Sequence, residues 1–485
     1  MRICVLQPDY GVSAAAHGEY DPPRDLSALL PDDQVVHVLL RKATVYRQLR
    51  ALRGEGFDVF VNLCEGYLDW DIPSIDVIDA LDRLGLPYTG PTARLYDPSK
   101  ALMKLCAHYA GVATPDFAIV SHPAQVPEAV AKLAFPLFAK PAHAGDSLGV
   151  DMDSLCADLP MLVAKVGRLA RDFDEILIER YLPGREFSVL VLAEPGGPGR
   201  GRALVPNEFV FPADIPFKTY DLKARQYLPD SNIPCREEPL ATRLRDAARA
   251  IFEVFGGVGY CRMDFRVDAF DTPCFIDANF ACSVLYPEGH SGTADYILAH
   301  EGLGQAGFLR HIIAEGLARH RAAAKPYAVV RSDASGYGIR ATRAIAPGEI
   351  VFRGEERAQR VVTRRHVEET WSPERREVFR RYAYPLSDEV FVLWDEDPAG
   401  WAPQNHSCDP NTAFDGLNVV ALRPIASGDE LTLDYHRFCD ERMEPFDCAC
   451  GAPSCRGRIT GRPGNTLDRR EAVRSNHALG AKAGS

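Results

Sequence analysis

Hydrophobic residues are distributed in two different ways along the 485-residue chain. Through the first 320 residues, apolar runs of strand length alternate with segments of helical periodicity; residues 59–63 predict a strand and residues 75–84 a helix. After a helical stretch at 300–324 this rhythm gives way to short strands and turns, apart from a charged stretch at 363–381. The pattern predicts an α/β part followed by a mainly β part.

The composition narrows the class of protein. Hydrophobic residues make up 46% of the chain and charged residues 25%, as in soluble globular proteins, and the length indicates more than one hydrophobic core. The net charge of −12 leaves no basic stripe to neutralise phosphates, which argues against a general nucleic-acid binder. We find no apolar window of membrane-spanning length and no signal-peptide pattern, so we expect a cytoplasmic protein with neither nucleic acid nor membrane as partner.

Cysteine spacing gives the first chemical signal. Cys448, Cys450 and Cys455 fall within eight residues, and Cys408 lies in the polar segment 405–411, Asn-His-Ser-Cys-Asp-Pro-Asn. Four thiolates complete a closed tetrahedral zinc site, which stabilises a small, loop-rich segment. The alternative is a chance cluster of free or buried thiols. The other nine cysteines (13 less 4) are scattered singly, which is typical of a reducing cytosol.

Further motifs accompany this cluster. Residues 336–342 read Gly-Tyr-Gly-Ile-Arg-Ala-Thr, residues 345–351 Ile-Ala-Pro-Gly-Glu-Ile-Val, residues 428–435 Gly-Asp-Glu-Leu-Thr-Leu-Asp-Tyr, and residues 446–451 Phe-Asp-Cys-Ala-Cys-Gly. In this order, with the 405–411 segment between them, they resemble the SET-domain protein lysine methyltransferases over residues 326–458. The resemblance implies a knot-like set of short β-sheets, with S-adenosylmethionine bound on one face and the substrate lysine entering a narrow channel from the other.

The resemblance also assigns roles to residues. Tyr435, on a strand predicted over residues 431–435, closes the lysine channel with its hydroxyl near the methyl group and orients the reactants. The lysine must be neutral to attack that methyl group, and a desolvating channel lowers the lysine pKa from its usual value of about 10.4. The implied methyl-donor site consists of Gly336, Tyr337, Gly338, Asn405, His406 and Phe446. Taken singly, Tyr435 also fits a core aromatic, and the glycines fit a tight turn.

The front part of the chain carries a second chemistry. Residues 135–150 predict a strand ending in Lys140-Pro141 and then a Gly/Ser loop, an arrangement that can hold nucleotide phosphates. Residues 175–187 predict a strand, a hinge and a second strand. Residues 259–265 and 274–279 predict a strand pair carrying oxygen ligands suited to Mg-ATP. Each signal alone also fits a plain loop or a solvated strand end; their combination favours a nucleotide site.

Together these segments resemble the ATP-grasp ligases, in particular the D-alanine–D-alanine ligases, over residues 55–300; residues 86–91, 97–100 and 220–223 match as well. The implied reaction is attack of a carboxylate on the γ-phosphate of ATP, followed by displacement of phosphate by an amine to give an amide. The implied roles are phosphate binding by Lys100, Lys140, Ser147 and Lys223, adenine binding by Glu179, ribose binding by Glu186, Mg²⁺ binding by Asp264, Asp277 and Asn279, and oxyanion stabilisation by Arg262.

The chain departs from the ligase pattern at four places. Asp277 stands where the family usually has Glu, and residues 143–146 read His-Ala-Gly-Asp where it has Arg-Glu-Gly-Ser. The family's first-strand Gly-Gly-x-Ser-x-Glu is replaced by Gln-Pro-Asp-Tyr-Gly at residues 7–11, and residues 280–282 replace a Pro-Gly turn. Most of these segments contact the amino-acid substrates in the family, so D-alanine itself is a poor candidate while ATP binding is retained.

The predicted fold is multidomain: an α/β (α+β) ATP-grasp fold followed by a mainly β SET domain of the β-clip type with a small zinc-binding appendix. The predicted domains are an N-terminal α/β domain at 1–95, the ATP-grasp nucleotide-binding and catalytic domain at 96–320, the SET domain at 326–445, the post-SET zinc segment at 446–458 and a disordered tail at 459–485.

The sequence favours a bifunctional enzyme, an ATP/Mg²⁺-dependent carboxylate–amine ligase that is also an S-adenosylmethionine-dependent lysine methyltransferase. The alternative is a lysine methyltransferase alone, whose degenerate ATP-grasp unit binds a nucleotide or peptide; Tyr435 and the donor motifs argue against a non-catalytic scaffold. We expect the partners to be a small amino-acid or peptide substrate, a lysine-containing protein or both. The dimers common among the ligases also imply a homodimer.

Overall fold

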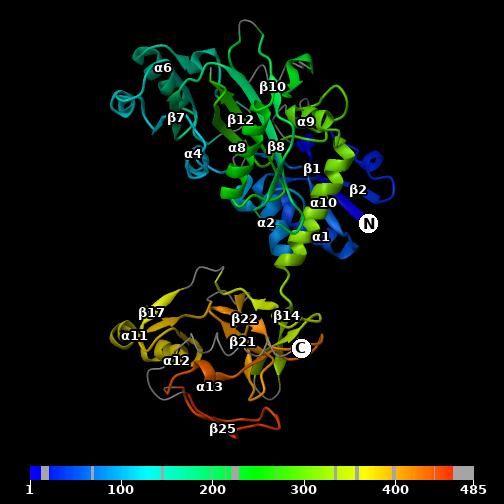
Figure 1. Cartoon of the computed structure of the whole chain (residues 1–485), viewed down its shortest axis with the longest axis vertical. Coiled ribbons are helices and arrows are strands. Elements are labelled where there is room, and N and C mark those ends of the chain that lie inside the picture. Colours follow the sequence, from blue (N-terminus) through cyan, green and yellow to red (C-terminus); the bar gives the residue numbers. More distant parts are fainter. Residues whose placement is uncertain are drawn as a thin grey trace. The chain divides into compact units, whose positions relative to one another are not determined.

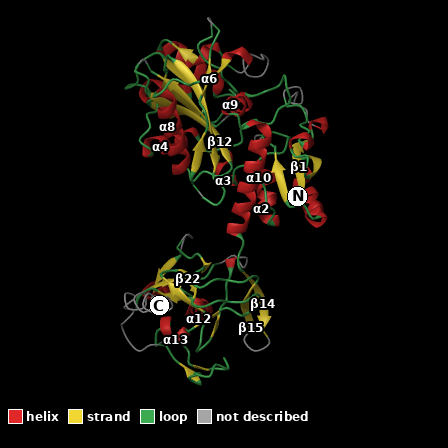
Figure 2. Cartoon of the chain, turned by 45° about the vertical axis from the view of Figure 1, so that its right-hand side comes forward, coloured by secondary structure: helices red, strands yellow, loops and turns green. Residues whose placement is uncertain are grey.

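The structure is a computed structural model that describes residues 1–12, 21–66, 70–143, 147–197, 199–212, 215–219, 229–268, 270–332, 336–355, 360–395, 400–441 and 443–461. The chain divides into two compact units, Met1–Ala323 and Ala324–Ser485 (Figure 1). In the first unit helices cover the sheets, whereas the second unit consists mainly of short strands and loops (Figure 2). Every helix of the described part is too short or too polar to cross a membrane.

A parallel three-stranded sheet begins the first unit. Its strands β1 (Arg2–Pro8), β2 (Gln34–Leu40) and β3 (Val59–Asn62) lie in the order β2-β1-β3. β1 and β3 are buried on both faces, which explains why their sequences are continuously apolar rather than alternating. Helices α1 (Val45–Leu52) and α2 (Ile75–Leu84) share a core with the sheet. The strand and helix predicted at 59–63 and 75–84 are confirmed.

A four-stranded antiparallel sheet follows in the chain. Its strands β4 (Phe117–Val120), β7 (Ile176–Arg180), β5 (Leu137–Pro141) and β6 (Leu155–Cys156) lie in the order β4-β7-β5-β6. Helices α5 (Val126–Ala129) and α6 (Leu159–Leu169) share its apolar core. The predicted strand ending in Lys-Pro is therefore β5, and the predicted strand, hinge and strand are β7 and β8 (Arg185–Ala193).

β8 runs through the middle of a larger antiparallel sheet of order β11-β10-β8-β12-β13, with β9 also paired to β8. The other strands are β9 (Gly201–Ala203), β10 (Asn207–Phe209), β11 (Asn232–Pro234), β12 (Tyr260–Val267) and β13 (Pro273–Asn279). Alternate residues of β8 enter two cores: Val189 packs with helix α8 (Leu240–Val254), and Leu190 packs with β1 and β3. Two-sided burial again accounts for an uninterrupted apolar sequence. The β12–β13 pair was predicted and is confirmed.

The remaining helices of the first unit include α3 (Ala93–Tyr96) and α4 (Lys100–Tyr109). The single helical stretch predicted at 300–324 is wrong in one respect, because it is two helices, α9 (Thr293–Glu301) and α10 (Gly304–Ala323). Gly302 ends α9 with φ 76°, a left-handed conformation that glycine adopts without a Cβ clash. The apolar pattern continues across this break because both helices enter the same core.

The described part of the second unit contains five small sheets. They pair β14 (Tyr327–Ser332) with β15 (Gly336–Ala341), β16 (Ile350–Phe352) with β22 (Asn418–Ala421) and β21 (Thr412–Asp415), β17 (Val361–Thr363) with β19 (Val390–Val392) and β18 (Tyr384–Pro385), β20 (Asn405–His406) with β23 (Thr432–Leu433), and β24 (Phe446–Asp447) with β25 (Arg458–Ile459). Strands from several sheets contribute to one core around Ile339, Val419 and Leu431.

The helices of the second unit are short. The charged stretch at 363–381 forms α11 (Arg364–Thr370) and α12 (Pro373–Tyr382), separated where Ser372 caps the second helix and proline occupies its first position. The third is α13 (Tyr435–Phe438). The disordered tail predicted at 459–485 is wrong at its start, because Ile459 is a buried residue of β25. Residues 462–485 lie outside the described residues.

Candidate functional site

Four of the residues singled out in the sequence lie together on one face of the large sheet. Arg262 and Asp264 share this face because alternate residues of β12 point to the same side. On β13, Asn279 lies opposite Arg262 and Asp277 lies opposite Asp264. All four side chains line one cavity of the first unit. The strand register thus gathers two carboxylates, an amide and a guanidinium at one place.

Asp264 is held by one residue of the neighbouring strand and one residue of its own strand. Ser188 on β8, its partner in the register, donates a hydrogen bond to Oδ1 at 2.6 Å, and Arg262 Nε donates to the same oxygen at 3.2 Å. Asp277 is held differently, since Lys100 Nζ at the start of α4 lies 2.9 Å from Asp277 Oδ2. The two acids therefore face the cavity with fixed orientations.

Glu179 occupies the centre of a buried three-residue ion cluster. Lys104 Nζ and Lys140 Nζ each lie 2.7 Å from one oxygen of its carboxylate, and the residue is 4% exposed. Burial opposes ionisation, but attraction to Lys140 and Lys104 outweighs it and lowers the pKa of Glu179 to about 2. Burial lowers the pKa of Lys104, whereas for Lys140 the neighbouring carboxylates outweigh burial and raise the pKa.

Glu186 lies between two further cations. Lys218 Nζ and Arg266 Nη2 each lie 3.0 Å from its carboxylate, at opposite oxygens. Burial raises the pKa of this carboxyl, but Lys218 and Arg266 outweigh the effect, and the pKa lies below its usual value. Three aromatic rings line the cavity nearby: Phe138 lies 4.9 Å from Phe217 and 6.3 Å from Tyr181 between ring centroids. The cavity thus combines apolar ring surfaces with many cations.

Two predicted site residues belong to loops. Ser147 lines the cavity and has a left-handed φ of 57°, but residues 144–146 before it lie outside the described part of the chain. Lys223 also lies outside the described residues, with the segment 220–228 around it. The cavity that Arg262, Asp264, Asp277 and Asn279 line is therefore also lined by five other predicted site residues: Lys100, Lys140, Ser147, Glu179 and Glu186.

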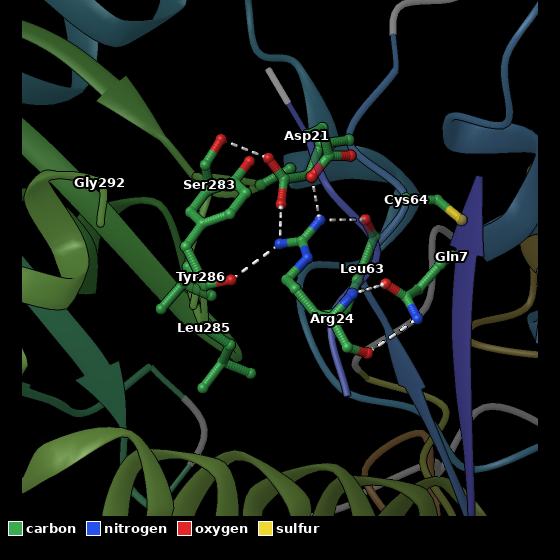
Figure 3. Close-up of polar contacts among 12 residues, drawn as sticks. Gln7, Asp21, Arg24, Leu63, Cys64, Ser283, Leu285, Tyr286 and Gly292 are labelled. Carbon is green, nitrogen blue, oxygen red and sulfur yellow. Dashed lines mark hydrogen bonds and ion pairs between the residues drawn. The ribbon is translucent and has the colours of Figure 1, made fainter. Parts of the chain in front are cut away.

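A second polar network lies around Arg24 (Figure 3), and its residues Glu65 and Ser283 line the same cavity. Its centre is Arg24, whose side chain is 1% exposed and whose guanidinium lies 2.7 Å from Asp21 and 3.2 Å from Glu65. Ser283 Oγ donates to the second oxygen of Glu65 at 2.5 Å. Two carboxylates and one guanidinium leave this network with a net negative charge, in contrast to the lysines around Glu179.

Gln7 belongs to the segment 7–11, which replaces the first-strand motif of the ligase family, and its contacts show what this segment does instead. Its side-chain amide donates to the backbone oxygen of Arg24 at 3.1 Å and accepts from the backbone nitrogen of Arg24 at 2.7 Å (Figure 3). Gln7 is buried, so it fixes the segment that carries Arg24. The carboxylate that this end of the cavity presents comes from Glu65, in the segment after β3.

In the second unit, Tyr435 is held at its hydroxyl and at its backbone. The hydroxyl donates to the carbonyl oxygen of Gln404 at 2.5 Å, and the backbone nitrogen donates to His406 Nδ1 at 3.1 Å. Burial raises the pKa of Tyr435 to about 12 and lowers that of His406. The prediction that Tyr435 lies on a strand was wrong: β23 ends at Leu433, and Tyr435 begins α13, which Asp434 caps by accepting from the His436 nitrogen.

The predicted donor-binding glycines have different surroundings. A Cβ added at Gly338 would lie 2.7 Å from Asn405 Nδ2 and 2.8 Å from Glu430 Oε1, two atoms joined by a 2.6 Å hydrogen bond. Gly338 is therefore needed for a close approach. Gly336 instead has φ 81°, and an added Cβ would meet no described atom within 4 Å. Tyr337 between them is 64% exposed.

Aromatic rings surround Tyr435. Its ring lies 5.6 Å from Phe438 and 6.1 Å from Phe446 between centroids, and Phe446 also contacts His406 at 5.6 Å. Phe414 packs against Phe438 at 5.1 Å. The predicted residues Asn405, His406, Tyr435 and Phe446 are thus neighbours in space, and an apolar wall adjoins them.

The four cysteines form one cluster. The sulfurs of Cys408, Cys448, Cys450 and Cys455 all lie within 4.8 Å of one another, and Cys408 and Cys448 are 3.9 Å apart. Four sulfurs about 2.3 Å from a central zinc ion stand about 3.8 Å apart, so this spacing fits a tetrahedral site. The backbone nitrogen of Cys408 donates to Cys450 Sγ and lowers the pKa of that thiol, whereas burial raises the pKa of the Cys448 thiol.

Comparisons with known proteins identify both units. The model of the D-ala D-ala ligase C-terminus matches residues 106–282, and the SET domain model matches residues 336–436. The D-alanine–D-alanine ligase of Laribacter hongkongensis is 32% identical over 242 residues, which cover 48% of this chain and 72% of that protein. The chain belongs to the D-alanine–D-alanine ligase family. It also contains a SET domain.

A further relative and a solved structure are also similar to this chain. The D-alanine–D-alanine ligase of Bordetella petrii is 29% identical over 283 residues, covering 56% of this chain and 82% of that enzyme. The D-alanine–D-alanine ligase of Bacillus anthracis complexed with ATP aligns with 67% of this chain and 99% of that chain, at 18% identity and a TM-score of 0.47. The predicted fold class, an ATP-grasp ligase followed by a mainly β SET domain, is confirmed.

Several residues in or next to the cavity of the first unit were not predicted from the sequence. Lys104 follows Lys100 by one helical turn, and Arg266 follows Asp264 at the next residue on the same strand face, so both positions had a periodic signal. Glu65 and Lys218 lie outside helices and strands, where no periodicity marks a side chain as facing a site. Glu430 belongs to the motif at residues 428–435, but its contact with Asn405 is apparent only in the folded structure.

Proposed function

We propose that the first unit is an ATP- and Mg²⁺-dependent carboxylate–amine ligase. The observation that carries this is one cavity lined by Asp264, Asp277 and Asn279 together with Lys100 and Lys140, in which Lys100 pairs with Asp277 at 2.9 Å. Mg²⁺ prefers carboxylate and phosphate oxygens, and it bridges the phosphates of ATP. ATP would supply the phosphoryl group that activates a substrate carboxylate, and an amine would then displace phosphate to form an amide.

The residues of the cavity divide this work. Phe138, Tyr181 and Phe217 offer ring surfaces for the adenine base. Arg262 would stabilise the negative charge that develops on the carbonyl oxygen during amide formation. Glu179, with a lysine at each oxygen, would orient Lys140 toward the phosphates as well as meet the base.

Binding of Mg-ATP would rearrange the Lys100–Asp277 pair. The ammonium neutralises the carboxylate at 2.9 Å, so Asp277 would hold Mg²⁺ only after Lys100 has moved away from it. Release of Lys100 makes its charge available to the phosphates. The aspartate thus serves the metal in one state and the lysine in the other.

The substrates of the ligase would be amino acids or small peptides other than D-alanine. The network around Arg24 places the anionic Glu65 at the cavity, where it can accept the ammonium group of such a substrate. Because Gln7 is engaged with the Arg24 backbone, recognition of this group falls to Glu65.

We further propose that the second unit is an S-adenosylmethionine-dependent lysine N-methyltransferase. Asn405, Gly338 and the neighbouring Glu430 would hold the donor, which supplies the methyl group, and Tyr435 would orient the acceptor amine with the hydroxyl that Gln404 fixes. Zinc at the four cysteines would hold the 405–411 segment to the segment 446–455. The acceptor is a lysine of a protein or of the ligase product.

The test is phosphate release by the purified protein with Mg-ATP and pooled L- and D-amino acids and small peptides. Release that requires one pool, with an amide product in mass spectrometry, supports the ligase. That product and basic proteins are then offered to the enzyme with methyl-labelled S-adenosylmethionine. Methyl transfer without any stimulated phosphate release would instead support a methyltransferase whose first unit only binds nucleotide, a function that the shortened acid Asp277 and its pairing with Lys100 favour.

A further inference from the structure

Two polar connections join the cysteine cluster (Cys408, Cys448, Cys450 and Cys455) to the segment of Tyr435. The first passes through His406. Because the Tyr435 backbone nitrogen donates to Nδ1 at 3.1 Å, Nδ1 carries no proton, and the neutral ring has its proton at Nε2. Nε2 lies 3.4 Å from Cys408 Sγ, so it donates to that sulfur. One buried ring therefore links the tyrosine backbone to a cysteine of the cluster.

The second connection passes through Arg456, which follows Cys455 in the chain. Its backbone nitrogen donates to Cys408 Sγ at 3.4 Å, and its guanidinium Nη2 lies 2.7 Å from Asp434 Oδ2. Asp434 is buried, and its other oxygen caps the helix that Tyr435 begins. Arg456 is thus attached to the cluster through its backbone and to the residue before Tyr435 through its side chain.

A third contact fixes the hydroxyl of Tyr435, and it comes from the segment that contains His406 and Cys408. Gln404, whose carbonyl oxygen accepts from the Tyr435 hydroxyl at 2.5 Å, lies four residues before Cys408. The segment 404–408, which includes β20, therefore contains the hydroxyl acceptor, the residue Asn405 that contacts Glu430, the imidazole of His406 and one cysteine. A movement of Cys408 would therefore displace each of these residues as well.

Thiols interact only weakly with one another, whereas a metal ion would fix four thiolates at one point. Polar groups around metal ligands orient those ligands and are oriented by them. We propose that Arg456 and His406 are positioning residues that transmit closure of the cysteine cluster around zinc to Tyr435. Zinc binding then sets the position of the tyrosine, in addition to stabilising the segment. The name of the reaction rests on the proposed methyltransferase function, but the positioning can be measured without methyl transfer.

The test places 3-fluorotyrosine at position 435 of the full chain and follows its ¹⁹F resonance. With zinc bound we expect a single sharp resonance, which shifts and broadens when 1,10-phenanthroline removes the metal. Arg456→Gln should give the shifted, broadened resonance even with one zinc ion retained per chain, and Arg456→Lys should restore most of the original one because an ammonium can still pair with Asp434. The matched control is Arg458→Gln, since Arg458 is 66% exposed on its side chain and pairs with the exposed Asp447.

Zinc content, measured by metal analysis, separates transmission from simple loss of the ion. A wild-type resonance in zinc-loaded Arg456→Gln would overturn the role of Arg456, and an equal change in Arg458→Gln would show a general effect on the segment instead.

For the other connection, His406→Phe keeps a ring against Phe446 but removes both nitrogens. It should broaden the resonance and speed zinc transfer to the chelator several-fold; unchanged values in both would overturn the role of His406. If methyl transfer is absent but these results hold, only the proposed reaction fails.

Discussion

Lys100 and Asp277 are 177 positions apart in the sequence, yet Lys100 Nζ lies 2.9 Å from Asp277 Oδ2. One of these side chains is a candidate phosphate ligand and the other a candidate metal ligand. Their pairing connects nucleotide binding with metal binding at a single contact, and it gives the most direct test of the ligase assignment.

Asp277→Asn should lower Mg-ATP-dependent phosphate release by roughly 10²-fold, because the metal loses an anionic ligand that stabilises transferring charge. Asp277→Glu should retain or increase release, since it restores the longer acid usual in the ligase family. Steady-state rates across a magnesium titration measure both effects. Equal activity of the Asn and Asp enzymes would contradict metal binding by this residue.

Glu179→Gln should destabilise the first unit by about 3–5 kcal/mol, because it leaves Lys104 and Lys140 buried without an anionic partner. Denaturant unfolding followed by a probe in the first unit measures the change. Glu175→Gln is the matched control, since Glu175 is a half-exposed residue paired with His143. A change similar in size to that of the control would show that the cluster contributes little.

The same carboxylate gives an expected pH dependence. The pKa of Glu179 is lowered to about 2 in the folded protein, so folding stabilises its charged form. Its contribution to stability is fully present above the unfolded-state pKa of about 4.3 and is lost as the pH falls toward 2. Stability measured between pH 6 and pH 3 should decline less steeply in Glu179→Gln than in the wild type. Parallel curves would contradict this account.

Gly338→Ala should weaken S-adenosylmethionine binding at least about tenfold, since the added Cβ would lie 2.7 Å from Asn405 and 2.8 Å from Glu430. Gly348→Asn is the matched control, because that position lies outside the predicted donor site, has open space and a left-handed φ of 78°, and asparagine tolerates such a φ. Titration calorimetry compares the two variants. Wild-type affinity in Gly338→Ala would show that these groups do not bind the donor.

Tyr435→Phe should lower the rate of methyl transfer with a smaller effect on donor affinity, because only the hydroxyl held by Gln404 is lost. Since burial raises the pKa of this phenol to about 12, ionisation of Tyr435 should produce no step in the pH–rate profile below pH 10. Full activity in the variant would remove Tyr435 from the mechanism.

Removal of zinc should unfold or loosen the second unit and leave nucleotide binding by the first unit in place. A chelator removes the ion that would hold the four cysteines together. The ATP-grasp unit, in contrast, is stabilised by its own hydrophobic cores. Thermal melting and ATP-analogue binding with and without chelator compare the two. Equal loss of both properties would indicate that the units depend on each other.

The sequence by itself determined the two-part organisation and much of the candidate chemistry. Local signals suffice where a function requires consecutive residues: the spacing of Cys448, Cys450 and Cys455, the lysine at the end of β5, and the paired strands that carry Asp264 and Asp277. In each case the period of a strand or the shortness of a loop fixes which side chains meet.

Only the tertiary structure decided how distant charges are paired. The contacts of Glu179 with Lys104 and Lys140, of Glu186 with Lys218 and Arg266, and of Arg24 with Glu65 join different elements or loops. The start of a helix at Tyr435 was equally hidden, because the Asp434 cap and its partner Arg456 come from separate segments. Such contacts depend on how elements pack against each other, and periodicity along the chain indicates which face of an element a residue is on but not which other element that face meets.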